Sequence, residues 1–365
     1  MNDPNKNRRV SITSDALPII GEPNTPAVSR FNLTAAIERL RGRRKILIYM
    51  HDNPDPDSLA AAMGLGRLLE HELSAQTTLA VSGIVGRAEN RAMVEVLEIP
   101  IQTLHTLNPD DFDCLAIVDS QPRTGNNSLP THREADIVVD HHPARSNTRA
   151  TWFDVRDDFG ATSTIVLQYL HERNIPIDTR LATAFFYALR TETRDLGREA
   201  TEAERAAYVF LVSHINHDWL DRICHPKVPR QHFEALDRAM RSARVFGNIV
   251  AVNLDELSYP DLVAEIADLL LTFEGARFTL VGGRYQGKAY VSLRTDVDFK
   301  KAGATMRDVI GSDGTAGGHG TMAGGRLRNP IETPEAMQSA FANLVMRLQQ
   351  TLGQPQSVGV SLLGS

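Results

Sequence analysis

Residues 45–57 read KILIYMHDNPDPD, an apolar run that ends in a cluster of acids and one histidine. A short apolar run that turns polar at its end is typical of a buried strand in a parallel sheet. The residues that follow, SLAAAMGLGRLLEHEL at 58–73, have apolar side chains at helical spacing, with Ser58 as the expected N-cap. The stretch therefore predicts a strand, a polar turn and a helix.

The pattern of strand and helix repeats over the first half of the chain. Three further strands are predicted, TTLAVS (77–82), CLAIVD (114–119) and DIVVD (136–140), and helices are expected at 161–173, 179–191 and 201–214. Strands that alternate with helices indicate a doubly wound, mainly parallel sheet. In such sheets ligands bind beyond the carboxyl ends of the strands.

Changes in composition divide the chain into four parts. Residues 1–30 predict a disordered tail, and residues 31–225 predict the parallel-sheet domain. HPKVPRQ carries two prolines, so a linker helix is expected within 226–245. Residues 246–352 predict a smaller α/β domain with strands GNIVAVN, ARFTLVGG, KAYVSLRT and TMAGGRL and helices at 261–270 and 333–351. The residues after Gly353 are expected to be loose.

The composition is that of an ordinary globular protein. Of 365 residues, 42% are hydrophobic, and the formal net charge of −6 argues against coating of long nucleic acid, which usually needs a basic surplus. No apolar run reaches the ~18 residues of a membrane helix, and MNDPNKNRRV at the start lacks the apolar segment of a secretory signal. A cytoplasmic location is therefore expected. The two cysteines, Cys114 and Cys224, exclude a disulfide framework and a four-cysteine zinc site.

Three predicted strands end in clusters of acids and histidines. These clusters consist of His51, Asp55 and Asp57, then Asp119, then Asp140, His141 and His142. A parallel sheet brings all three strand ends to one edge. Packed carboxylates repel each other and lose hydration, and a divalent cation compensates both costs. Carboxylate and imidazole ligands suit Mn²⁺, Mg²⁺, Fe²⁺ or Zn²⁺, and two ions about 4 Å apart are a common device for phosphoryl chemistry.

Simpler explanations exist for each residue taken alone. An aspartate at a strand end can be the N-cap of the next helix, and Asp55 and Asp57 could bracket a proline turn. Capping does not explain three such strand ends in one domain, so the metal centre is preferred. RGRRK (41–45) is interpreted as a solvated helix end, with contact to a substrate phosphate as the alternative, and His214 and His217 are also assigned to a helix end.

The motifs HDNPDPD (51–57), AIVDS (116–120) and VVDHHPA (138–144) resemble the first three motifs of the DHH phosphoesterase superfamily. This superfamily includes RecJ-type exonucleases, family II inorganic pyrophosphatases, cyclic-dinucleotide phosphodiesterases and nanoRNase/pAp phosphatases. The resemblance covers residues 40–330, and the DHH triplet after an apolar strand is its most specific element.

The resemblance implies two divalent cations, Mn²⁺ in the first place and Mg²⁺ or another ion as alternatives. His51 and Asp55 would hold one ion. Asp57 and His141 would hold the other, and Asp119 would bridge the two. A water between the ions would be the nucleophile.

The resemblance also implies roles around the metals. His142 would contact the substrate phosphate, and Asp140 would orient the histidines from behind, a common role for carboxylates. The fourth motif departs from the family's Thr-Asp-Thr, since LATAFFYALRTETRDLG has Glu192 where aspartate is expected. Asp195 is an alternative ligand, and a solvated charge at a helix end is the alternative role for Glu192.

The second domain contains a glycine-rich stretch, GTAGGHGTMAGGRL at 314–327. Glycines let backbone amides approach a ligand closely, and the candidates are Gly317, Gly318, His319 and Gly320. Arg294 could face them as a phosphate clamp, because a guanidinium binds phosphate oxygens well. Both features resemble the DHHA1 domain, in which they bind the substrate; a tight turn is the alternative for the glycines.

The sequence thus predicts a two-domain α/β hydrolase with its active site in the cleft between the domains. The expected substrates are short oligonucleotides, as for a nanoRNase, and 3′-phosphoadenosine 5′-phosphate. A cyclic-dinucleotide phosphodiesterase and a RecJ-like single-strand exonuclease are alternatives, and a nucleotide-binding regulatory protein with a degenerate metal site is a candidate of another class. Long duplex nucleic acid and membranes are not expected partners, whereas a homodimer is left open.

Overall fold

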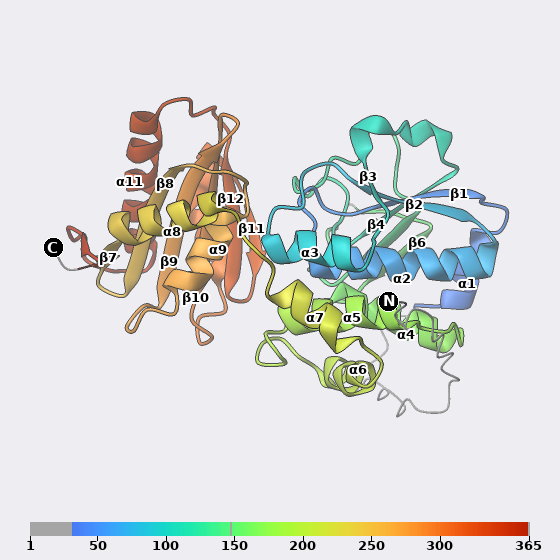
Figure 1. Cartoon of the computed structure of the whole chain (residues 1–365). Helices are drawn as coiled ribbons and strands as arrows, with labels where there is room; N and C mark the ends of the chain where they lie inside the picture. Colours follow the sequence, from blue (N-terminus) through green and yellow to red (C-terminus); the bar gives the residue numbers. More distant parts are fainter. Residues whose placement is uncertain (1–30, 147, 364–365) are drawn as a thin grey trace. The chain divides into compact units, whose positions relative to one another are not determined.

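The computed structural model describes residues 31–146 and 148–363, apart from the side chain of His319. The chain divides into two units, of which the first ends at Pro226 and the second begins at Lys227 (Figure 1). The tail predicted at 1–30 lies outside the described residues. Each unit contains helices and one sheet, which confirms the predicted two-domain α/β class.

The first unit is built on a six-stranded sheet in the order β3-β2-β1-β4-β5-β6, with parallel pairing throughout. Its strands are β1 (Lys45–Tyr49), β2 (Gln76–Val81), β3 (Ile101–Thr103), β4 (Cys114–Val118), β5 (Ile137–Asp140) and β6 (Trp152–Val155). The strand order reverses between β1 and β4, as in a doubly wound sheet. Ligands of open α/β sheets bind at such a switch point, so the ends of β1 and β4 are the expected place of the site.

The two faces of this sheet are covered differently. The helices are α1 (Leu33–Arg39), α2 (Pro56–Leu73), α3 (Ala88–Val96), α4 (Thr162–Glu172), α5 (Thr179–Glu192), α6 (Glu202–Val212) and α7 (His217–Cys224). All of them share one core with Ile46 and Ile48 of β1. Leu47 and Tyr49 point to the other face, where they pack with residues from the short 3-10 turns and loops, including Leu104 and Leu107. In the described residues, turns and loops therefore cover this second face of the sheet, whereas the helices pack on the first face.

Helix α2 begins with a capping box that fixes the acidic residues after β1. Its N-cap is Asp55, whose Oδ1 accepts a hydrogen bond from the Ser58 amide at 3.0 Å, while Ser58 Oγ accepts one from the Asp55 amide at 3.1 Å. The prediction of Ser58 as the N-cap is wrong, because Ser58 is the third helical residue of this box. Pro56 fits the first helical position, where no amide hydrogen is needed.

Gly64 lets α2 pack closely on α4 and α5. A Cβ at this position would lie 2.5 Å from Phe185 Cζ and 2.8 Å from Val166 Cγ1. We expect Gly64→Ala to lower the free energy of unfolding by about 1–3 kcal/mol, since the surrounding core would have to move. Urea unfolding measures the loss. Gly324→Ala is the control, because no heavy atom lies within 4 Å of its new Cβ; equal losses in both variants would contradict the prediction.

The second unit has a seven-stranded sheet in the order β11-β12-β10-β9-β8-β7-β13, in which only the β8–β9 pair is parallel. Its strands are β7 (Arg244–Phe246), β8 (Ile249–Glu256), β9 (Phe278–Tyr285), β10 (Lys288–Thr295), β11 (Gly314–His319), β12 (Met322–Leu327) and β13 (Val360–Ser361). Its helices are α8 (Arg230–Ser242), α9 (Leu262–Leu270), α10 (Ala302–Ile310) and α11 (Pro334–Thr351).

Two features of this unit differ from simple expectation. Helix α8, within the range predicted for a linker helix, packs Ala235 and Ala239 into the core of the unit. Strand β13 pairs with β7 through Val360 and Val245, so the expectation that all residues after Gly353 are loose is wrong. None of the helices in the described part of the chain combines the length and apolar character needed to cross a membrane.

Candidate metal centre

Asp119 lies at the centre of the predicted site. It directly follows β4 and has a φ of 54°, a left-handed conformation that costs energy for a residue with a Cβ. Its buried carboxylate faces two imidazoles: Oδ2 lies 3.7 Å from His51 Nε2, and Oδ1 lies 3.5 Å from His141 Nε2. The sheet thus brings residues from the ends of β1, β4 and β5 together, as the sequence predicted.

His51, Asp55 and Asp119 form one group that could hold a cation, with candidate ligand atoms within 4.8 Å of one another. His51 Nε2 lies 3.6 Å from Asp55 Oδ1. Such separations are too long for hydrogen bonds. Two atoms that are each about 2.1 Å from one ion lie about 3.0 to 3.4 Å apart, so the spacing suits ligands around an ion. Burial opposes ionisation of Asp55, but His51 and the Ser58 amide hold its pKa below the ordinary value.

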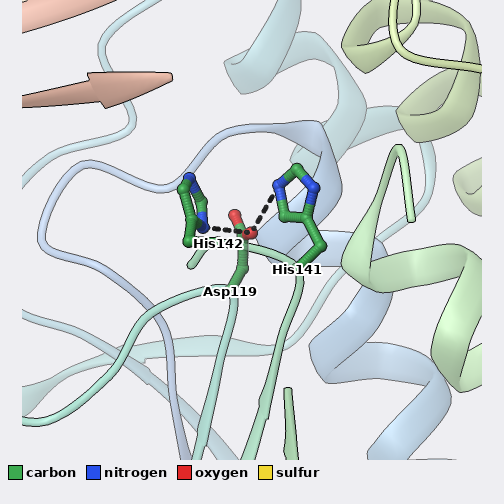
Figure 2. Close-up of side chains that lie close together, drawn as sticks. All are labelled: Asp119, His141 and His142. Atoms are coloured by element: carbon green, nitrogen blue, oxygen red, sulfur yellow. Dashed lines mark ion pairs between the residues drawn. The ribbon is translucent and has the colours of Figure 1, made fainter. Parts of the chain in front are cut away.

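His141 and His142 flank Asp119 (Figure 2). His141 Nδ1 lies 3.3 Å from the carbonyl oxygen of Phe159, a contact that places the proton on Nδ1 and directs Nε2 toward Asp119. His142 Nδ1 donates to Asp140 Oδ1 at 2.8 Å. Burial opposes the charged form of His142, but the hydrogen bond and charge of Asp140 raise its pKa to about 9. In the metal-free site this raised pKa favours the protonated ring of His142, and a charged imidazole suits contact with a phosphate.

Asp57 lies in the first turn of α2 and caps a different helix, α4. Its Oδ2 accepts from the Thr162 amide at 2.7 Å and its Oδ1 from the Ser163 amide at 2.9 Å. Ala161, the N-cap of α4, has no side chain that could do this. A carboxylate at a helix N-terminus is favourable because it meets the positive end of the helix dipole. The alternative that an aspartate caps the next helix therefore holds for Asp55, the N-cap of α2, whereas Asp57 caps α4 and is buried beside the other acids.

Thr162 also belongs to the site, although the sequence did not predict it, because its hydroxyl donates to Asp119 Oδ1 at 3.0 Å. The start of a helix at Ala161 without a capping side chain indicated only that the cap of α4 comes from another segment, and it did not indicate the contact with Asp119. A helix that begins so deep in the fold must obtain its cap from elsewhere in the chain.

Two carboxylates of the site, those of Asp57 and Asp119, are not fully compensated by the protein itself. Burial, followed by the charges of Glu192 and Asp55, raises the pKa of Asp57 to about 7. Burial and the charges of Asp57 and Asp55 raise the pKa of Asp119 well above its ordinary value. A divalent cation would reverse both shifts, because it stabilises the ionised form. The residues present therefore fit a metal centre.

Glu192, the last residue of α5, borders the acidic cluster, since its charge contributes to the raised pKa of Asp119. Its Oε1 lies 3.8 Å from Arg198 Nη2, and the same nitrogen donates to the carbonyl oxygen of Glu192 at 2.6 Å. Asp195 is engaged elsewhere, because its Oδ1 accepts from Arg190 Nε at 2.8 Å. Of the two candidates for the fourth motif, these contacts favour Glu192.

The glycine-rich stretch of the second unit is a hairpin. Gly317 and Gly318 belong to β11, and Gly320 lies in the two-residue turn to β12, so the alternative of a tight turn holds for Gly320. A Cβ at Gly318 would overlap the backbone of Met322, so packing within the unit already requires glycine there. No heavy atom lies within 4 Å of a Cβ built at Gly317. The side chain of His319 lies outside the described part.

Arg294 of β10 pairs with Met322, which pairs in turn with His319. The backbone register therefore places Arg294 and His319 in one row across the sheet. The buried guanidinium of Arg294 donates from Nε to Asp268 Oδ1 at 2.8 Å and from Nη1 to Ser292 Oγ at 2.9 Å. Its role as a phosphate clamp stays a prediction.

The basic cluster RGRRK lies at the amino end of β1, on the edge of the sheet opposite to His51. Arg43 donates to the carbonyl oxygen of Asp113, and Arg44 donates to that of Leu73 at 2.9 Å. These arginines support the ends of neighbouring elements. The cluster thus lies at the opposite end of β1 from the candidate metal ligands, and its contact with a substrate phosphate stays a prediction.

Comparison with known proteins supports the assignment of the motifs. Residues 45–189 match the family model described as the DHH family, N-terminal domain. An uncharacterised protein of Methanocaldococcus jannaschii is 32% identical over 302 residues, which are 82% of this chain and 61% of that protein. A probable manganese-dependent inorganic pyrophosphatase of Lactiplantibacillus plantarum is 24% identical over 166 residues, which are 45% of this chain and 53% of that protein. The chain thus spans 61% and 53% of the lengths of these two relatives.

The fold has a counterpart among solved structures. A crystal structure of an exopolyphosphatase-related protein from Bacteroides fragilis superposes with a TM-score of 0.67 at 13% identity, covering 89% of this chain and 100% of that one. At this identity the likeness concerns the fold alone. The match over residues 45–189, together with the motifs and the parallel sheet that brings them together, places this segment of the chain in the DHH family.

Proposed function

We propose that the chain is a metal-dependent phosphoesterase that hydrolyses short oligonucleotides or 3′-phosphoadenosine 5′-phosphate. The observation that carries the proposal is the position of Asp119, whose two oxygens face His51 and His141. A carboxylate placed in this way can hold two cations close together, the arrangement that many phosphoryl-transfer enzymes use. The curated relative of Lactiplantibacillus plantarum, named as manganese-dependent, supports a divalent cation.

The residues would divide between two ions. His51, Asp55 and Asp119 Oδ2 would hold the first ion; His141, Asp57, Glu192 and Asp119 Oδ1 would hold the second. When bound, two cations neutralise charge on a phosphate and lower the pKa of a water. Mn²⁺ is the first candidate, since imidazole together with carboxylate ligands suits it and Mg²⁺ prefers oxygen ligands alone.

The chain's own groups would position the reactants. Thr162 donates to Asp119 and fixes the carboxylate, and the carbonyl oxygen of Phe159 orients His141. His142 carries a positive charge that attracts a phosphate oxygen, and Asp140 holds its ring. We assign further contacts with the nucleotide to Gly317, Gly318, His319, Gly320 and Arg294 of the second unit, following its resemblance to a DHHA1 domain.

Product analysis with Mn²⁺ tests this function. The substrates are 3′-phosphoadenosine 5′-phosphate, di- to pentanucleotides, cyclic dinucleotides, pyrophosphate, polyphosphate and longer single strands. We expect release of 5′-mononucleotides from the short oligonucleotides, release of phosphate from 3′-phosphoadenosine 5′-phosphate, and loss of both activities with a chelator. Faster turnover of pyrophosphate or cyclic dinucleotides would overturn the substrate assignment. Binding of these nucleotides without turnover in Mn²⁺ would favour the regulatory protein.

A further inference from the structure

We propose that Gln121 is a positioning residue that holds the ring of His142 in place through Asp140. The proposal rests on the proposed function, in which His142 contacts the substrate phosphate. Gln121 follows Asp119 by two residues, in the turn after β4, and its side chain is 1% exposed. A buried polar side chain must be hydrogen-bonded, and its partners therefore indicate what it does.

Every polar atom of the Gln121 side chain has a partner in the last residue of β5 or in the turn that follows it. Nε2 donates to Asp140 Oδ2 at 2.8 Å and to the carbonyl oxygen of Pro143 at 3.2 Å. Oε1 accepts from the Arg145 amide at 2.9 Å. The amide orientation is unambiguous, because the nitrogen faces three acceptors, Asp140 Oδ2 and the carbonyl oxygens of His142 and Pro143, and the oxygen faces a donor. Gln121 thus contacts the whole turn that carries the paired histidines.

Both carboxylate oxygens of Asp140 accept hydrogen bonds. Oδ2 receives the hydrogen bond from Gln121, and Oδ1 receives hydrogen bonds from His142 Nδ1 at 2.8 Å and from the His142 amide at 3.2 Å. Rotation of the carboxylate would break contacts on both sides. The orientation of the His142 ring therefore depends on Asp140, and that of Asp140 depends on Gln121.

The backbone of Gln121 is fixed as well. Its carbonyl oxygen accepts from Thr124 Oγ1 at 2.8 Å and from Asn127 Nδ2 at 2.8 Å. The side chain thus connects the rigid turn after β4, which carries Asp119, with the turn after β5, which carries His142. Gln121 thus adds a side-chain connection between these two parts of the site to the pairing of β4 with β5.

The chemistry of this position is specific for an amide. Glutamate has the same shape, but its carboxylate would face the oxygens of Asp140 and Pro143, where like charge and unpaired acceptors repel. Methionine has nearly the same length, but it leaves Asp140 Oδ2 and the Arg145 amide without partners. Gln121→Met therefore removes the hydrogen bonds with little change in volume, and Gln121→Glu reverses their polarity.

The test is a double-mutant cycle with bis-p-nitrophenyl phosphate and Mn²⁺. We expect Gln121→Met to lower kcat/KM by about 10- to 100-fold, as replacements behind a reactive group do. In the His142→Ala background the same change should alter kcat/KM by less than about twofold, because the ring that Gln121 positions is gone. Gln102→Met, on an exposed position of the edge strand β3, is the matched control and should keep full activity.

Equal losses in both backgrounds would overturn the proposal, since they would indicate a general structural role. A second readout does not need turnover: in the metal-free protein, Gln121→Met should shift the NMR signal of the His142 Nδ1 proton and leave that of His141 in place. Thermal unfolding checks the fold, and Gln121→Glu replaces the methionine variant if the latter is unfolded. Were the wild-type protein inactive on every phosphate ester, the proposed function would fail, whereas the NMR comparison would still decide the role of Gln121.

Discussion

Asp119→Asn is expected to lower kcat/KM for phosphodiester hydrolysis in Mn²⁺ on the order of a thousandfold, the upper range for loss of one electrostatic group in an active site. The substitution keeps the shape of the side chain and can keep the hydrogen bond from Thr162. It removes the charge that both groups of ligands share, because the two oxygens of Asp119 face His51 and His141. No other described carboxylate has this position between both histidines.

Steady-state kinetics with bis-p-nitrophenyl phosphate measure this effect, and calorimetric titration with Mn²⁺ measures the loss of ion binding. Asp110→Asn, a change of the same kind at an exposed position of the same unit, is the control and should behave like the wild-type protein. An Asp119→Asn variant that kept more than about a tenth of the activity would contradict the assignment of Asp119 as the shared ligand.

The metal-free protein is expected to become less stable as the pH rises, and Mn²⁺ is expected to remove this loss. The pKa of Asp57 is about 7 in the folded protein against an ordinary value of 3.8, so the folded state keeps a proton that the unfolded state loses between these values. Stability therefore falls as the pH rises through this window. The raised pKa of Asp119 acts in the same direction.

His142 extends the effect to higher pH. Its pKa of about 9 lies above the ordinary 6.5, so its contribution to stability is complete below 6.5 and is lost as the pH rises through 9. Asp55 and Asp140 act in the opposite direction. Their pKa values are lowered in the folded protein, so they stabilise it at a pH above the ordinary pKa of an aspartate. This contribution is lost only as the pH falls through the lowered pKa values. As the pH rises from the ordinary pKa of an aspartate to alkaline values, the metal-free protein should thus become steadily less stable.

Thermal unfolding at pH 5 and pH 8, with chelator or with Mn²⁺, measures this dependence. We expect the Tm of the chelated protein to fall on the order of 5 °C between the two conditions, and the Mn²⁺-loaded protein to show the opposite trend. Chelated Asp119→Asn should be more stable than the wild-type protein at pH 8, because it relieves like-charge repulsion, and the difference should shrink toward pH 4. A chelated Tm that rises from pH 5 to pH 8 would contradict the expectation.

The arrangement of the site was predictable from the sequence because it depends on a few local patterns. The strands at β1, β4 and β5 are apolar runs that end in polar residues, and a parallel sheet necessarily brings their ends to one edge. That argument required no contact between distant residues. It placed Asp119 near His51 and His141, which the structure confirms.

The missed features depend on contacts between distant segments. Thr162 and Gln121 acquire their roles only when α4 and the turn after β4 reach the centre, and nothing in their local sequence indicates these partners. Strands β3 and β6 are too short for a periodic pattern. Strand β11 contains Gly317 and Gly318, which disfavour strands, and forms because pairing with β12 overrides that preference.

The two hydrogen bonds that the Asp57 carboxylate accepts from amides at the start of α4 bear on how such motifs are compared between genomes. Selection for a folded protein alone would retain an acid at this position, even in a descendant that no longer turned over any substrate. Selection for a folded protein would not retain an acid at position 119, because a neutral residue there would relieve like-charge repulsion in a protein that binds no ions. A survey that separates active members from pseudoenzymes should therefore give more weight to the acid after β4 than to the last acid of HDNPDPD.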